Sequence, residues 1–258
     1  MKSRICIAFA LVLAVTGLAA AQSAILVYDS NTNNQYAQTA AANLSTLVTV
    51  AGSGDFNTQL ASQSWDLVMV DCPSTTPTGG WTGLIAFVNG GGPTVMSFWD
   101  WDNDSGQGDP GLAAAFGFTS ATSFSLVDTV STLTAASTTV GTTIFSGVPG
   151  MPHSSWLNSW GDDGDAFGFV GATAIADLSD AADPVVILNP SGGAIAGFVI
   201  DEWSGEGAVE FWENMGNYVL SGAPVAEPIP VVSPVGMVLL AALIAGVGAF
   251  LIGRQRLF

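Results

Sequence analysis

The first hundred residues alternate between short apolar runs and segments of mixed polarity. The apolar runs are continuous and rich in strand-forming residues, and they predict buried strands at 24–29, 46–52, 66–71 and 93–99. The segments between them predict helices at 36–45, 55–64 and 81–90. Because strands that alternate with helices are typical of βαβ units, this order predicts an α/β fold with a mostly parallel sheet flanked by helices.

The second half of the chain is less regular. Residues 116–147 are rich in Ser and Thr and predict either short edge strands or a long surface excursion. Two apolar runs at 183–189 and 194–203, separated by Pro-Ser-Gly-Gly, predict an antiparallel β-hairpin. Apolar residues recur at helical spacing within 205–222, which predicts a final helix.

The two ends of the chain have the patterns of targeting segments. Residues 1–21 contain a basic start, an apolar run and small residues before Gln22, as in a secretory signal peptide. Residues 224–234 are a Pro-rich linker, and 235–258 combine an uncharged stretch long enough for a transmembrane helix with a basic tail. The remaining 22–223 are therefore the predicted exported domain.

Charge separates this domain from its ends. The chain has four Lys and Arg residues and 21 Asp and Glu residues, and all four basic residues lie in the first four and last five positions. The exported domain therefore has no Lys or Arg side chain to pair with its carboxylates or to contact a phosphate. We expect no nucleic-acid partner, and we expect self-repulsion that salt screens.

The order of these segments resembles the class I glutamine amidotransferase-like fold, a flavodoxin-like architecture, in its non-catalytic exported form. The segments that carry the resemblance are spread over most of the domain: AILVYD at 24–29, SWDLVMVD at 64–71, GGPTVMSFWD at 91–100, TIFSGVPG at 143–150, the hairpin at 184–203 and the closing helix. Enzymes of that family have a catalytic Cys in the turn after the fourth strand and a His-x-Glu pair downstream. Here the turn is Ser97 to Asp100, and His153 is followed by two Ser residues.

The C-terminal segment resembles the sorting signals that exosortase-type enzymes process in Gram-negative bacteria, in particular the IPTL-CTERM variant. The residues that match its pattern are Ile229, Pro230, Ser233 and Gly236. The residues that depart from it are Val231, Val232, Pro234 and Val235. The resemblance implies an exosortase-type processing enzyme as a partner and a location in the cell envelope or at the cell surface.

One polar segment, DWDNDSGQGD at 100–109, has the composition of a calcium loop. Its predicted ligands are Asp100, Asp102, Asp104 and Asp109. Calcium prefers six to eight oxygen ligands from a flexible loop, and alternating Asp residues can supply them. The turn Gly and the final Glu of an EF-hand are replaced by Ser105 and Gly111, so a solvated acidic loop remains the alternative.

Three further groups are candidates for chemistry, and each has a structural alternative. Asp162, Asp163 and Asp165 either complete the first acidic site or form a solvated turn. Cys72 and His153 form either a thiol–imidazole dyad or two unrelated residues, with Cys72 packed as a small apolar side chain. The Trp residues near the acidic segments either stack on sugars or belong to the core, namely Trp99, Trp101, Trp156 and Trp160.

These patterns lead us to expect a non-catalytic cell-surface or extracellular-matrix protein with a binding or structural role. One alternative is a metal-assisted or carboxylate-dependent hydrolase that uses Asp100 and Asp102, and another is a calcium-dependent adhesion module. An exposed, Trp-lined groove with a bound metal would favour the alternatives. An edge filled by side chains would favour the non-catalytic domain.

Overall fold

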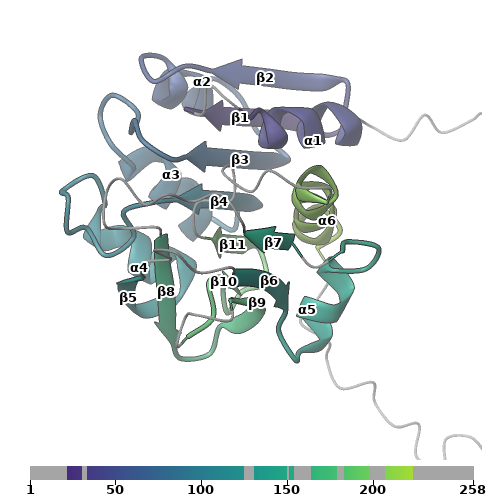
Figure 1. Cartoon of the computed structure of the whole chain (residues 1–258). Helices are drawn as coiled ribbons and strands as arrows, with labels where there is room; N and C mark the ends of the chain where they lie inside the picture. Colours follow the sequence, from purple (N-terminus) through teal and green to yellow (C-terminus); the bar gives the residue numbers. More distant parts are fainter. Residues whose placement is uncertain are drawn as a thin grey trace, which may run out of the picture.

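The computed structural model contains one large sheet with helices on both faces and a second, two-stranded sheet (Figure 1). It describes residues 22–30, 34–124, 131–149, 151–153, 164–178, 183–197 and 207–222. The large sheet has nine strands in the order β2-β1-β3-β4-β11-β10-β9-β6-β7. The small sheet pairs β5 (Phe118–Phe124) with β8 (Gly164–Phe169) in antiparallel orientation.

The first five strands of the large sheet are parallel neighbours. They are β2 (Leu47–Ala51), β1 (Ala24–Asp29), β3 (Leu67–Cys72), β4 (Thr94–Phe98) and β11 (Ala194–Gly197). The other four continue the sheet in antiparallel pairs and are β10 (Val186–Leu188), β9 (Thr173–Leu178), β6 (Ser131–Ala135) and β7 (Met151–His153). Only β10 and β6 run against the other seven, so the sheet is mostly parallel, as the sequence predicts.

The sheet separates the core into two layers, and helices cover each of them. On one face of the sheet, α1 (Tyr36–Leu44), α5 (Thr139–Ile144) and α6 (Ala208–Leu220) supply core residues such as Ala37, Ile144 and Trp212. On the other face, α2 (Phe56–Ser62), α3 (Thr82–Asn89) and α4 (Pro110–Phe116) supply Phe56, Leu84 and Phe116. Every residue of β3 and β4 is buried, which explains why these segments are almost continuously apolar.

The predicted elements between residues 24 and 98 are all present, within about two residues of their predicted ends. The hairpin is also present as β10 and β11, and the closing helix as α6. Helix α4 was not predicted. It begins where the side chain of Asp109 accepts a hydrogen bond from the Gly111 N–H, and it ends at Gly117, whose φ is 79°.

The predicted targeting segments, residues 1–21 and 224–258, lie outside the described residues. Among the helices that are described, none combines the length and the apolar character needed to cross a membrane.

Candidate functional site

The segment between β4 and α4, residues 99–109, lies at the carboxyl ends of the parallel strands. This is the edge at which open α/β sheets bind their ligands. We call these residues the β4–α4 loop. All four predicted metal ligands lie on it, between the buried end of β4 and the first turn of α4.

Asp100 is fully buried and is held by the main chain of its own loop. One carboxylate oxygen accepts the Ser105 N–H at 3.0 Å, and the other accepts the Gln107 and Gly108 N–H groups at 2.6 and 2.8 Å. Burial raises the pKa of the Asp100 carboxyl, and these three donors partly oppose that rise. The side chain thus closes the loop into a compact turn, and there is no room for a side chain at Gly108, where an added Cβ would lie 2.6 Å from the Asp100 carbonyl oxygen.

Asp102 and Asp104 lie nearer the surface than Asp100. Asp102 is half-buried and accepts the Asp104 N–H at 3.1 Å and the Ser123 hydroxyl of β5 at 2.8 Å. Asp104 is exposed and accepts the Ser105 hydroxyl at 3.0 Å. One carboxylate oxygen from each of Asp100, Asp102 and Asp104 lies within 4.8 Å of the others, so the three could contact one cation. Their oxygens are the ligand type that calcium prefers.

Asp109 does not belong to this group of three carboxylates. Its Oδ1 accepts the Gly111 N–H at 2.7 Å and caps α4. The residue that follows, Pro110, occupies the first helical turn, where a missing N–H costs nothing. An Asp-Pro pair before an apolar run is a helix-start signal, and it could have been recognised in the sequence.

Trp101 fills the space beneath the loop and is only 4% exposed. Its main-chain N–H donates to the Asp165 carboxylate at 2.8 Å, and its indole N–H donates to the Gly197 carbonyl of β11 at 2.8 Å. The indole lies edge-on to Phe98, Phe116 and Phe167, with ring centroids 5.2 to 5.6 Å apart. Trp101 is therefore a core residue that anchors the loop, and it offers no exposed ring to a ligand.

The outer part of the loop rests on the segment after β3. The indole N–H of Trp81 donates to the Gln107 carbonyl at 3.1 Å, and the hydroxyl of Thr76 donates to the Gln107 side-chain oxygen at 2.8 Å. Trp81 is itself buried between Tyr28, Phe56 and Phe98. Buried aromatic side chains thus fill the interior beneath this edge on this face of the sheet.

Cys72 is buried at the end of β3, in the interior position expected for a packed side chain. Its thiol donates a hydrogen bond to the Thr75 carbonyl at 3.3 Å, and the Tyr28 hydroxyl donates to the same carbonyl. Burial, together with the neighbouring Cys72 thiol, raises the pKa of Tyr28. For His153 only the backbone, at the end of β7, is described, so the pairing with Cys72 stays a prediction.

A row of polar residues that was not singled out in the sequence lies at the same edge but on the other face of the sheet. Asp29, Asp71 and Ser97 are direct register partners across β1, β3 and β4. Asp71 and Ser97 are fully buried, and Asp29 accepts a hydrogen bond from the Gln38 side chain at 3.2 Å. Each is the last or next-to-last residue of an apolar strand. A polar residue at this shared position could have been recognised in the sequence, because the carboxyl ends of parallel strands meet at the ligand edge of the sheet.

The other predicted candidates are placed only in part. Asp165 is described and contacts the β4–α4 loop through Trp101, whereas Asp162, Asp163, Trp156 and Trp160 lie outside the described residues. Trp99 is half-buried and packs against Phe98, with 6.4 Å between ring centroids.

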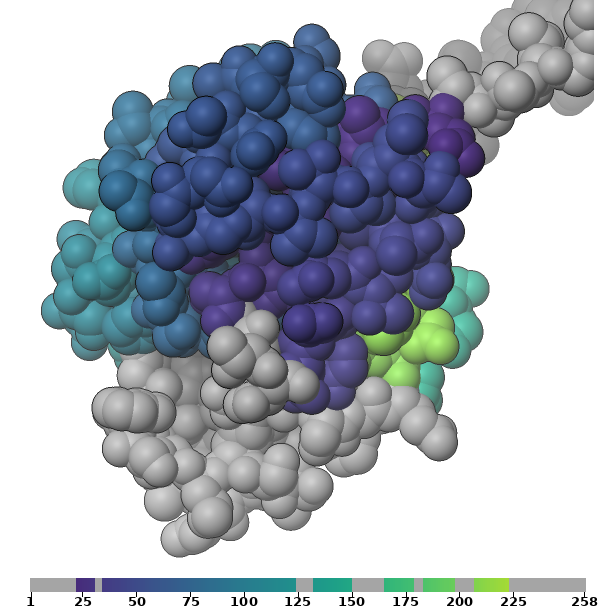
Figure 2. Space-filling model, turned by 90° about the horizontal axis from the view of Figure 1, so that it is seen from above, coloured from purple at the N-terminus to yellow at the C-terminus, as the bar shows by residue number. Residues whose placement is uncertain are grey.

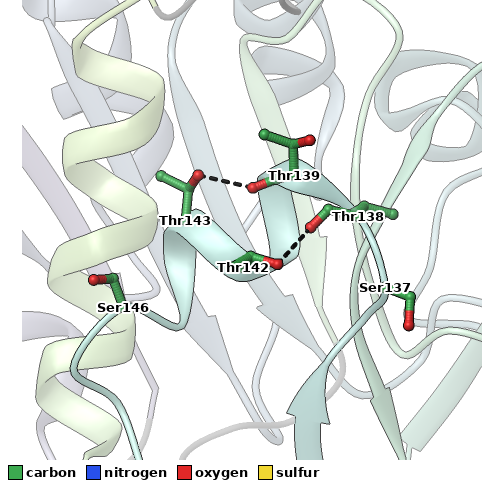
Figure 3. Close-up of a pocket in the computed structure, with 6 residues that line it drawn as sticks. All are labelled: Ser137, Thr138, Thr139, Thr142, Thr143 and Ser146. Atoms are coloured by element: carbon green, nitrogen blue, oxygen red, sulfur yellow. Dashed lines mark hydrogen bonds between the residues drawn. The ribbon is translucent and has the colours of Figure 1, made fainter.

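One cavity of about 680 Å³ lies away from this edge, along α5 (Figure 3). Only hydroxyl side chains line it: Ser137, Thr138, Thr139, Thr142, Thr143 and Ser146. Three of these hydroxyls donate to carbonyls of the protein itself, namely Thr138 to Ala174, Thr142 to Thr138 and Thr143 to Thr139. The cavity is open and its lining is uncharged, and these hydroxyls have no arrangement that points to a particular ligand.

Comparisons with known proteins give only structural likenesses. No protein-family model matches the chain, and no curated protein is similar to it in sequence. Similar solved structures include a protein described as a candidate component of GMP synthase from Thermoplasma acidophilum, with 12% identity, 77% of this chain and 95% of that chain covered, and a TM-score of 0.49.

A second is a glutamine amidotransferase from Methylobacillus flagellatus, with 11% identity, 78% of this chain and 95% of that chain covered, and a TM-score of 0.47. A third is a ThuA-like protein from Bacteroides uniformis, with 11% identity, 79% of this chain and 93% of that chain covered, and a TM-score of 0.47. The activities in these names belong to those proteins. The fold assignment for this chain rests on its own strand order and register.

Proposed function

We propose that this chain is a non-catalytic domain, exported to the cell surface or extracellular matrix, with a binding or structural role. The observation that carries the proposal is the set of hydrogen bonds that the Asp100 carboxylate accepts. Both of its carboxylate oxygens accept main-chain N–H groups of the β4–α4 loop and the side chain is fully buried, so this carboxylate at the ligand edge of the sheet holds the loop.

The filled edge supports the same proposal. Trp101 and Trp81 are buried beneath the loop and pack against Phe98 on the β4 strand. The turn from Ser97 to Asp100 contains no Cys, so the nucleophile of the amidotransferases that the sequence resembles is missing. Export and sorting by an exosortase-type enzyme rest on the signal peptide and C-terminal patterns of the sequence.

A second role, calcium binding by the same loop, is favoured by one observation. Oxygens of Asp100, Asp102 and Asp104 lie within 4.8 Å of one another, in a domain without any Lys or Arg to offset their charge. A divalent cation would relieve the repulsion between these carboxylates and stiffen the loop. The calcium would then be structural, or would support adhesion, and it would not need a substrate.

The experiment for the main proposal combines location and chemistry. The tagged full-length chain is expressed in a host that has an exosortase-type enzyme, and intact cells are treated with a protease that cannot enter them. We expect the domain to be cleaved from the surface, and we expect the purified protein to leave ester, amide and glycoside test substrates intact. Protection of the domain inside the cell would refute the export. Turnover that Asp100→Asn abolishes without unfolding the protein would refute the non-catalytic role.

A further inference from the structure

The two ends of the nine-stranded sheet differ in how they are protected from other chains. At one end, β7 contains Pro152, which lacks an N–H and so cannot complete a ladder of hydrogen bonds. At the other end, β2 has the sequence Leu-Val-Thr-Val-Ala, without proline or charge. It pairs with β1 in five consecutive positions without a bulge. Of the features that protect an edge strand, β2 therefore lacks proline, charge and a bulge.

Exposed apolar side chains gather on the same strand. Leu47 is 53% exposed and Val50 is 50% exposed, and together with Val170 they are the large exposed apolar residues of the described chain. Figure 2, which looks down on the β2 end of the sheet, shows the segment around β2 in indigo at the surface. This end of the described structure thus combines an edge strand with exposed apolar side chains.

We propose that β2 is a self-association edge, through which two copies of this chain pair in antiparallel orientation into one continuous sheet. Full overlap of the five residues has its two-fold axis at Thr49, so Thr49 lies opposite Thr49 of the second copy. In this register Val48 lies opposite Val50, and Leu47 lies opposite Ala51, so apolar residues face each other on both sides of the axis.

The symmetry of the β2 sequence favours a second copy as the occupant, because Val48 and Val50 flank Thr49 and face each other in the antiparallel register. The formal net charge is −17, and no Lys or Arg lies between Gln22 and Gly253, so two copies repel each other over most of their surfaces. An uncharged edge is where such chains can meet without placing carboxylates directly opposite one another. The pairing should therefore strengthen as salt screens the remaining repulsion. Five residues on each side form a small interface, which makes the association concentration-dependent.

The first test measures the mass of the full-length chain in detergent by sedimentation at low and high salt. We expect dimers that increase with protein concentration and with salt. Val50→Asp should raise the dissociation constant about tenfold or more, since it places a carboxylate at both symmetric positions of the edge. Val170→Asp is the matched control, because it makes the same change at an exposed valine outside β2, and it should leave the dimer unchanged.

The second test checks the register by oxidative crosslinking. Thr49→Cys places two thiols directly opposite each other, at a distance that suits a disulfide. Leu47→Cys places them about 14 Å apart, because each lies two residues from the axis on its own strand. All three proteins carry Cys6→Ser, so that the buried Cys72 is the single native thiol. We expect a covalent dimer from Thr49→Cys, and little from Leu47→Cys or from the background protein without an added Cys. A monomer at all salt concentrations, a dimer insensitive to Val50→Asp, or equal crosslinking by both Cys variants would overturn the proposal.

Discussion

The carboxylate of Asp165 accepts the main-chain N–H of Trp101 at 2.8 Å, across 64 positions of the sequence. This bond joins β8 of the small sheet to the β4–α4 loop, and both residues are buried. Replacing Asp165 by Ala would leave the Trp101 N–H buried without its acceptor, so we expect the free energy of unfolding to fall by about 1–3 kcal/mol. Chemical denaturation measures the change. Asp104→Ala, an exposed residue of the same loop, should change it by less than about 0.5 kcal/mol.

The pH dependence of stability should have an unusual direction for a protein with so many carboxylates. Burial raises the pKa of Asp177 on β9 above its usual value of 3.8 in the folded state. The folded protein therefore binds a proton more tightly than the unfolded chain does. This contribution to stability is fully present below the unfolded pKa and is lost as the pH rises through the folded pKa. Burial also raises the pKa of Asp100, so this carboxyl acts in the same direction.

We therefore expect the melting temperature to rise as the pH falls from neutral towards the range just above 3.8. Asp177→Asn removes one titrating group, so this variant should melt higher than the wild type at neutral pH and depend less on pH. Melting curves at several pH values and fixed ionic strength measure both effects. A wild type that loses stability steadily on acidification over this range would show that other groups dominate.

Calcium and sodium chloride should act differently on the domain. Sodium chloride should raise the melting temperature gradually, because it screens repulsion among the carboxylates. If the β4–α4 loop binds calcium, a calcium concentration of a hundred times the dissociation constant should add about 2.7 kcal/mol. The double variant Asp102→Ala and Asp104→Ala should lose the calcium effect and keep the sodium chloride effect. If calcium raises the melting temperature of both proteins equally at fixed ionic strength, the β4–α4 loop does not bind calcium.

Cys72 should behave as a core residue without a chemical role. Its side chain is 0% exposed, so a thiol reagent should not react with it in the folded protein. The test uses a Cys6→Ser background, which leaves Cys72 as the single thiol. We expect reaction only on unfolding, and a small loss of stability in Cys72→Ala. Fast reaction of the native thiol, reduced by His153→Ala, would instead reveal the dyad.

Much of the fold could be predicted from the sequence because the N-terminal half obeys local rules. Strands β1, β3 and β4 are buried on both faces, so their apolar runs are long and clear. The pairing of β5 with β8 could not be predicted, because it joins polar segments about 40 residues apart, and its register depends on long-range packing.

The candidate site could be predicted in position but not in detail. The sequence places four Asp residues at the ligand edge of the sheet, where they lie. It does not show that Asp109 caps α4, or that Asp100 turns inward to the N–H groups of Ser105, Gln107 and Gly108. The alternation of Asp residues looks the same whether the carboxylates bind a cation or the main chain, because both partners select the same oxygens.

The C-terminal targeting pattern gives a prediction about export. Arg254 and Arg256 would hold the short tail in the cytoplasm before processing. Replacing both by Glu should therefore reduce the amount of domain that reaches the cell surface, as measured by labelling of intact cells. Replacing both by Lys is the matched control and should preserve surface display, because it keeps the charge. Equal display of the Glu variant would contradict the sorting role of these residues.

The unfolding free energy of Asp100→Ala is the most direct test of the non-catalytic role. The Asp100 carboxylate accepts three main-chain hydrogen bonds, and its loss leaves three loop N–H groups without their acceptor. We expect stability to fall by about 2–4 kcal/mol, while Asp104→Ala stays within about 0.5 kcal/mol of the wild type. An Asp100→Ala protein as stable as the wild type, but without a hydrolytic activity that the wild type has, would contradict a purely structural Asp100.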